Sequence, residues 1–259
     1  MSRLVDVIVA AALEAGTEIE RIYGAGCATE YKADGSPVTE ADRRAEEIIL
    51  AHLAAAFPDI PVLAEEEACA GRIPELGDRF FCVDPLDGTK GFVARNGEFT
   101  VNIALVEGGR PTAGVVYAPD LHLLYYGAAG EGAFRARDGA APEPIRPRPR
   151  PSQGLTGVGS RNHPADGAEE RNRALGITDY VPSGSSLKFC VLAEGGADVY
   201  PRYGPTAEWD TAAGQAVLEA AGGCVLALDE EGREAGPLSY GKVERGFLNP
   251  NFVAWGSPG

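Results

Sequence analysis

The chain has 259 residues, which is enough to bury a substantial core as one large domain or as two halves packed together. Its hydrophobic fraction of 44% and charged fraction of 24% are globular values. The formal net charge of −15 argues against a nucleic acid polymer as partner and against broad binding to an anionic membrane, because both require a basic face. An anionic small molecule remains compatible with this charge, because bound metal ions reverse the local field.

Cysteine usage and the N-terminus indicate the compartment. The five cysteines are dispersed without C-x-x-C spacing, which is typical of reduced thiols in a cytosolic protein. Arg3, Asp6 and Glu14 interrupt the apolar repeat at the N-terminus, so we expect no signal peptide, and no apolar run is long enough to span a membrane. We expect a cytoplasmic protein. A weak peripheral contact with the inner membrane and the choice between monomer and homodimer stay open.

The first elements follow from periodicity and turn signals. Apolar residues at helical spacing predict an amphipathic helix over 4–22, followed by a turn-rich loop over 31–37. A capping-box pattern at Thr39–Asp42 predicts the start of a second helix, which Pro58 ends. A short strand is expected at 61–64.

A strand-like run at 80–83 is expected to end where Pro85 interrupts the ladder, and Gly88 and Thr89 can open a helix. Three further β-rich runs predict an antiparallel meander, at 99–106, 113–118 and 121–126.

The segment 142–151, PEPIRPRPRP, predicts an extended connector. We interpret its three arginines as solvated. The connector divides an α+β half, 1–150, from an α/β half, 151–259, and the overall class is α/β. In the second half we expect strands at 155–159, 197–201, 224–228 and 252–255, and helices at 167–175, 185–194 and 210–221.

The strongest chemical signal is Asp84-Pro85-Leu86-Asp87-Gly88-Thr89. Two carboxylates at the end of a strand, next to the free amides of a helix start, suit Mg²⁺ and a substrate phosphate. An ordinary strand end and turn explains the motif alone equally well.

Other acidic residues occupy similar positions. Glu65 follows a short strand, Asp210 begins a helix, and Asp42 lies in the first turn of another. Taken singly, these residues are explained by helix caps or a solvated acidic run. Taken together, they match the carboxylate cage of a two-metal phosphoester hydrolase, in which the Thr89 hydroxyl orients a water and Asp42 accepts a hydrogen bond from Thr89.

With these residues assembled, the chain resembles the lithium-sensitive, Mg²⁺-dependent phosphatase superfamily that includes inositol monophosphatase. The resemblance rests on Asp84–Thr89, on Trp209-Asp210-Thr211-Ala212-Ala213-Gly214 and on Glu65-Glu66. Within the superfamily it is most similar to the bacterial 3′(2′),5′-bisphosphate nucleotidases, through residues 95–105, 184–190 and 200–206. Gly91 departs from the pattern, where an acidic residue is usual, but it is not a ligand position. The resemblance implies a five-layer αβαβα sandwich.

The resemblance also implies the roles of the site residues. One Mg²⁺ would lie on Glu65, Asp84 and the Leu86 carbonyl, and a second on Asp84, Asp87 and Asp210. Any third ion would be held largely through water. Glu65 and Thr89 would position the attacking water, with Asp42 supporting Thr89, and the N–H groups of Gly88 and Thr89 would hold the scissile phosphate. The implied reaction is hydrolysis of 3′-phosphoadenosine 5′-phosphate (PAP) to AMP and phosphate, with the sulfated analogue as a further substrate, in sulfur assimilation.

A second substrate phosphate needs cationic or N–H partners away from the metals. The candidates are Ser160, Arg161, Gly184, Ser185, Ser186, Lys188 and Arg202. Two alternatives stay open, namely the same chemistry on inositol monophosphate or another sugar phosphate, and a protein that binds metal or nucleotide without turnover.

Overall fold

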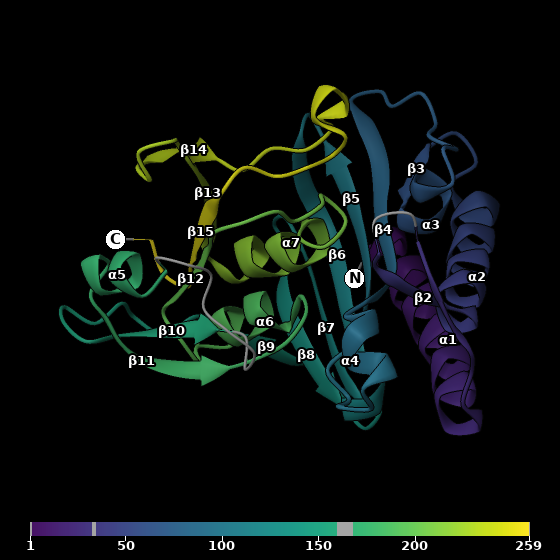
Figure 1. Ribbon diagram of the computed structural model, residues 1–259, viewed down its shortest axis with the longest axis horizontal. Helices are drawn as coiled ribbons and strands as arrows, with labels where there is room; N and C mark the ends of the chain where they lie inside the picture. The colour runs from purple at the N-terminus through teal and green to yellow at the C-terminus, as the bar shows by residue number, and fades with distance from the viewer. Residues whose placement is uncertain (1, 33–34, 160–167, 259) are drawn as a thin grey trace.

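The computed structural model describes residues 2–32, 35–159 and 168–258 of the protein. Two large sheets and three helical layers alternate through these residues (Figure 1). Helices α1 (Arg3–Ala25) and α2 (Glu40–Ala56) cover one face of a seven-stranded sheet. Helices α6 (Leu187–Ala193) and α7 (Ala212–Ala221) fill the space between this sheet and a six-stranded one, whose outer side carries α5 (Ala168–Ala174). The predicted five-layer αβαβα sandwich is confirmed.

The seven-stranded sheet has the order β3-β4-β5-β6-β7-β8-β9. Only β3 and β4 are parallel, and the other neighbours form an antiparallel meander. This sheet therefore contains the predicted meander and adds two strands, β8 and β9, that were not predicted. The strands are β3 (Val62–Ala64), β4 (Arg79–Asp87), β5 (Thr100–Glu107), β6 (Arg110–Ala118), β7 (Leu123–Ala128), β8 (Gly132–Arg137) and β9 (Glu143–Ile145).

The six-stranded sheet has the order β11-β10-β12-β15-β13-β14 and is mixed, because β10 is parallel to both its neighbours and the other pairs are antiparallel. Strands β11 and β14 were not predicted, whereas the other four were. The strands are β10 (Leu155–Gly159), β11 (Ile177–Pro182), β12 (Val199–Arg202), β13 (Cys224–Leu228), β14 (Glu234–Pro237) and β15 (Phe252–Trp255).

Short elements complete the chain. Strands β1 (Thr29–Tyr31) and β2 (Pro37–Thr39) pair at the two sides of the predicted loop. Helices α3 (Glu65–Cys69) and α4 (Thr89–Val93) begin at two of the acidic motifs, and 3₁₀ turns lie at Pro119–Leu121 and Val243–Arg245.

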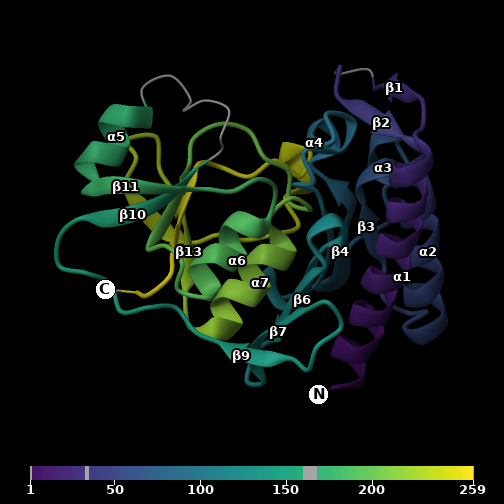
Figure 2. The same cartoon turned by 90° about the horizontal axis from the view of Figure 1, so that it is seen from below.

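The middle helical layer joins the sheets. Helix α7 contacts β5, β6 and β7 on one side and β13 on the other, and Figure 2 shows α6 and α7 between the sheets in a second view. One core cluster accordingly contains Phe80 and Val116 from the first sheet and Val225 and Phe252 from the second. The division of the chain near residue 150 stays a prediction. Strands on its two sides join different sheets, yet they share this core.

The connector differs from its prediction. Residues Glu143–Ile145 form the edge strand β9, which pairs with β8. The Arg148 guanidinium binds the Asp198 carboxylate through two hydrogen bonds of 2.7 and 2.6 Å, and Arg150 lies 3.8 Å from the centre of the Trp255 ring. The interpretation as solvated was wrong for Arg148, because Asp198 is 97% buried and needs a cation. Arg150 is exposed, as expected, although it also stacks on Trp255.

All five cysteines lie in the described part of the chain and are free thiols. Among the described helices, none combines the length and the apolar character that crossing a membrane requires.

Candidate metal centre

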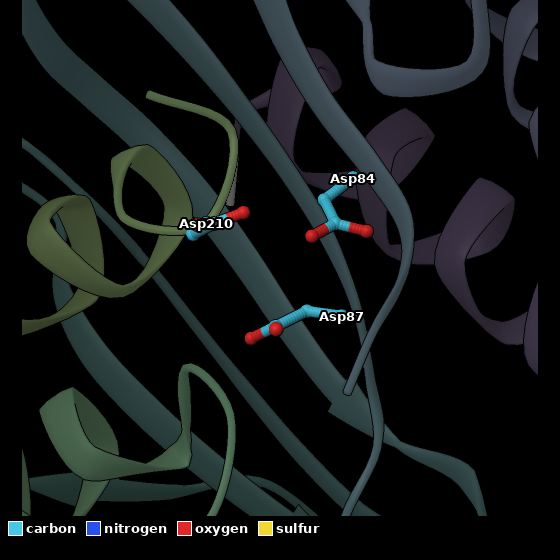
Figure 3. Close-up of side chains that lie close together, drawn as sticks. All are labelled: Asp84, Asp87 and Asp210. Atoms are coloured by element: carbon cyan, nitrogen blue, oxygen red, sulfur yellow. The ribbon is translucent and has the colours of Figure 1, made fainter. Parts of the chain in front are cut away.

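Three carboxylates converge between the two sheets. Asp84 and Asp87 come from the end of β4, and Asp210 from the loop before α7 (Figure 3). One oxygen of each lies within 4.8 Å of one oxygen of each other. Two distant parts of the chain thus bring carboxylate oxygens to one point, as the sequence predicted for these three residues.

A bulge in β4 brings the first two carboxylates together. The β4–β5 ladder runs without a break to the pair Asp84 and Asn102, shifts register, and resumes at Asp87 and Thr100. Pro85 lies in the shift, where its missing N–H removes one ladder bond. We predicted that the strand would end at Pro85. It continues through the bulge to Asp87 instead, because the chain re-pairs after the interruption.

Backbone amides orient two of the carboxylates. The Leu86 N–H donates to Asp84 Oδ1 at 2.9 Å, and the Ala207 N–H donates to Asp210 Oδ2 at 2.9 Å. Helix α7 begins at Ala212 rather than at Asp210 as predicted, and its N-cap residue is Thr211, which makes no side-chain cap hydrogen bond. The interpretation of Asp210 as a helix cap is therefore wrong.

Burial and mutual repulsion dominate the electrostatics. Burial raises the pKa of Asp84 well above its usual range, and the nearby carboxylates of Glu65, Asp87 and Asp210 raise it further. Burial, with the charge of Asp87, raises the pKa of Asp210 to about 8. The charge of Arg202 lowers the pKa of Asp210, but by less than burial and Asp87 raise it.

Glu65, the first residue of α3, lies beside this cluster. Burial raises its pKa, although Lys32 and a hydrogen bond with Asp84 act in the opposite direction. The Lys32 ammonium lies 2.7 Å from both Glu65 Oε1 and Glu66 Oε1. Burial lowers the Lys32 pKa, but the two glutamates outweigh this effect and the net shift is upward. Lys32 is thus a fixed cation at the edge of the acidic site.

Asp42 serves two partners at once. Its Oδ2 accepts hydrogen bonds from the Thr39 N–H and the Thr39 hydroxyl, both at 2.7 Å, which confirms the capping box at the start of α2. Its Oδ1 accepts from the Thr89 hydroxyl at 3.0 Å. Burial raises the pKa of Asp42, while the bonds from Thr39 and Thr89 lower it. The predicted contact between Asp42 and Thr89 is present.

The turn after the bulge requires glycine. Gly88 has φ of +92°, and a Cβ there would lie 2.8 Å from the Glu98 carbonyl oxygen. Helix α4 then begins at Thr89, whose hydroxyl lies 3.2 Å from the Leu86 carbonyl oxygen. The sequence Leu86-Asp87-Gly88-Thr89 therefore places a carbonyl, a carboxylate and a hydroxyl around one turn.

The donor set fits a hard divalent cation. Carboxylate and carbonyl oxygens are the ligands that Mg²⁺ prefers. The raised pKa values of Asp84 and Asp210 mean that a cation bound between them would relieve the burial cost of their charge.

Comparison with known proteins agrees with this geometry. A profile of the inositol monophosphatase family matches residues 1–252. The chain belongs to this family. It is 46% identical to the 3′(2′),5′-bisphosphate nucleotidase CysQ of Salmonella typhimurium over 243 residues, which are 93% of this chain and 95% of that protein. Identity to the Escherichia coli K12 protein of the same name is 43% over 251 residues, 96% and 98% of the two chains.

A crystal structure of CysQ from Bacteroides thetaiotaomicron, described as a bacterial member of the inositol monophosphatase family, has a similar fold. Its TM-score is 0.80 at 39% identity, covering 98% of this chain and 97% of that one. The metal dependence of the inositol monophosphatase family agrees with the acidic cluster.

The residues predicted to contact the second substrate phosphate make contacts within the protein. The Lys188 ammonium donates to the Ser185 carbonyl oxygen at 2.9 Å and lies 5.6 Å from the centre of the Tyr200 ring, and burial lowers its pKa. The Ser185 hydroxyl bonds the Asp87 carboxylate. A Cβ on Gly184 would lie 2.8 Å from Glu98 Oε2. Ser160 and Arg161 lie outside the described residues.

Arg202 keeps one donor for a ligand. Its Nη2 donates to the Pro205 carbonyl oxygen at 2.9 Å, whereas its Nε is buried without a hydrogen-bond partner. Such an unpaired buried donor is costly unless a ligand or water accepts from it.

Sequence reasoning missed two sets of residues near the site. Lys32 lies in a turn-rich segment, and no spacing connects it with Glu65. The second set is polar and buried: Thr100 and Asn102 are 0% exposed, and they lie next to the predicted contact Ser186, which is 2% exposed. An available signal was Asn102, a polar residue inside the apolar run FTVNIALV.

Proposed function

We propose that this protein is a Mg²⁺-dependent phosphatase that hydrolyses PAP to AMP and phosphate. The observation that carries the proposal is the convergence of Asp84, Asp87 and Asp210 in a chain that is 43–46% identical to proteins named 3′(2′),5′-bisphosphate nucleotidase. The sulfated analogue is a second proposed substrate. The proposed setting is sulfur assimilation in the cytoplasm, which the free state of the five cysteines supports.

Two Mg²⁺ ions are part of the proposal. Glu65, Asp84 and the Leu86 carbonyl would hold one ion, and Asp84, Asp87 and Asp210 the other. A third would be bound mainly through water. When bound, the ions would neutralise charge that develops on the phosphoryl oxygens and make a water more acidic.

The chain's own groups position the reactants. Glu65 and the Thr89 hydroxyl would orient the attacking water, and Asp42 holds Thr89 through its 3.0 Å hydrogen bond. The Gly88 and Thr89 amides, which precede the first helical bond of α4 at Phe92, would bind the scissile phosphate. Because Asp42 is fixed by Thr39, the Thr89 hydroxyl keeps its direction without reorganisation.

The second phosphate of PAP distinguishes this substrate from an inositol or sugar monophosphate. Lys188 and Arg202, from the second half, are proposed to bind it, together with Gly184, Ser185, Ser160 and Arg161. The unpaired Arg202 Nε supports an anionic ligand at this place. An inositol monophosphate or another sugar monophosphate has no second phosphate for these groups to bind, so we favour the nucleotide.

The test compares phosphate release from PAP and from inositol 1-phosphate under saturating Mg²⁺. We expect a higher kcat/KM for PAP and no turnover in EDTA. A preference for the inositol ester would overturn the substrate, and no release from any ester would favour a protein that binds without turnover.

A further inference from the structure

A buried polar network lies behind the acidic cluster. Thr100 and Asn102 are fully buried in β5, and Ser186, just before α6, is 2% exposed. Burying a polar side chain costs free energy unless the side chain is hydrogen-bonded. Three such side chains beside the proposed metal ligands therefore point to a role in the site.

The strand register aligns this network with the ligands. Thr100 is the β5 partner of Asp87, and Asn102 is the partner of Asp84. Side chains of directly paired residues lie on the same face of a sheet. The two polar residues of β5 therefore face the helical layer alongside the two aspartates.

Hydrogen bonds close the network. The Ser186 hydroxyl lies 2.6 Å from Asn102 Oδ1 and 2.8 Å from Thr100 Oγ1, and the Asn102 amide donates to Thr100 Oγ1 at 3.2 Å. If Ser186 donates to Asn102, the proton of Thr100 is available to Ser186 or to Ser185, whose hydroxyl also contacts Thr100. The three buried side chains are then all satisfied.

The network ends on one oxygen of a metal ligand. Asp87 Oδ2 accepts the Ser186 N–H at 2.8 Å and the Ser185 hydroxyl. Two donors on one oxygen fix the plane of the carboxylate. They reach Asp87 from residues 98 and 99 positions later in the chain, so the network also fixes the start of α6 against β5.

We propose that Thr100, Asn102 and Ser186 are positioning residues that hold Asp87 in its metal-binding orientation. This inference rests on the proposed function only in that Asp87 is a metal ligand. Outer groups that orient a ligand typically change metal affinity or activity about 10–100-fold when they are removed.

The experiment measures Mn²⁺ binding to the nucleotide-free protein by calorimetry and by electron paramagnetic resonance. Thr100→Val keeps the shape of the side chain and removes its hydroxyl, and Ser186→Ala removes the other hydroxyl. We expect each to raise the Mn²⁺ dissociation constant at least about 10-fold. The double variant should raise the dissociation constant by less than the product of the two single fold-changes, because both residues act through one network. Thr100→Ser should restore the native affinity.

Asp198→Asn is the matched control. It disturbs a buried polar group directly before β12, where Asp198 binds Arg148 and the Thr156 N–H. It should lower the melting temperature without changing Mn²⁺ affinity. Circular dichroism monitors the fold of every variant. Affinities of Thr100→Val and Ser186→Ala within twofold of native, or an equal loss in Asp198→Asn, would overturn the inference. If the native protein binds Mn²⁺ and the variants behave as expected, but the native protein does not hydrolyse PAP, only the proposed function is overturned.

Discussion

Asp210→Asn should make the metal-free protein more stable while it removes activity. The pKa of Asp210 rises from 3.8 to about 8, because burial and Asp87 disfavour its charge. Between these two values the folded state keeps a proton that the unfolded chain releases. The stability of the metal-free protein therefore falls as the pH rises through this window. Asparagine carries no charge and can still accept the Ala207 N–H.

The magnitude follows from the same values. At pH 7 the solution is about 3 pH units above the unfolded-state pKa of 3.8. At 1.36 kcal/mol per unit, keeping Asp210 protonated in the folded state costs about 4 kcal/mol of folding stability. The Asp210 side chain keeps some contact with water, so we take about half of this, about 2 kcal/mol. For a chain of this size, such a gain raises the melting temperature by about 4–8 °C.

Calorimetry in EDTA at pH 5, 6, 7 and 8 measures this effect. The advantage of Asp210→Asn should grow from pH 5 to pH 8, and saturating Mg²⁺ should stabilise the native protein more than the variant. A variant that is less stable than native in EDTA at pH 7, or an advantage that does not depend on pH, would refute this reasoning.

Three further substitutions test the site and its support. Asp84→Asn should reduce kcat/KM for PAP at least about 100-fold while circular dichroism stays native, because the proposed sites of both ions lose a carboxylate. Near-normal turnover at saturating Mg²⁺ would contradict its role. Thr89→Ala should lower kcat more than it changes KM, and Thr89→Ser should recover most of the rate, because we propose that the hydroxyl orients the water. Gly214→Ala should destabilise the protein by about 1–3 kcal/mol, since its Cβ would lie 2.4 Å from the Phe189 ring, whereas Gly24→Ala, with open space around it, should not.

Local chemistry made part of the fold predictable. The pattern at Thr39–Asp42 predicts a capping box from four residues, and Gly222 with its left-handed conformation ends α7 where the sequence places the stop. The long apolar runs of β5, β6 and β7 are almost fully buried, which gives them a clear strand signal.

Three of the unpredicted strands, β9, β11 and β14, lack that signal. Strands β11 and β14 lie at the two edges of their sheet and are mostly exposed, and β9 is the edge of the other. An edge strand with solvent on one side and no regular alternation has no hydrophobic pattern to read. Its pairing is decided by the neighbouring strand.

The site divides in the same way. The acidic residues of Asp84–Asp87 and Asp210 carry their chemistry in their side chains, so their convergence was predictable. The contact of Lys32 with Glu65 depends on how the β1–β2 segment folds over α3, which no short-range pattern encodes. The pairing of Thr100 with Asp87 depends on the bulge at Pro85, since a one-residue change of register would turn the side chain to the other face.

Anomalous diffraction from crystals grown with Mn²⁺ tests the metal centre most directly. We predict two peaks, one within coordinating distance of Asp84, Asp87 and Asp210 and one beside Asp84 and Glu65. A saturated crystal with no peak between the three aspartates would contradict the account.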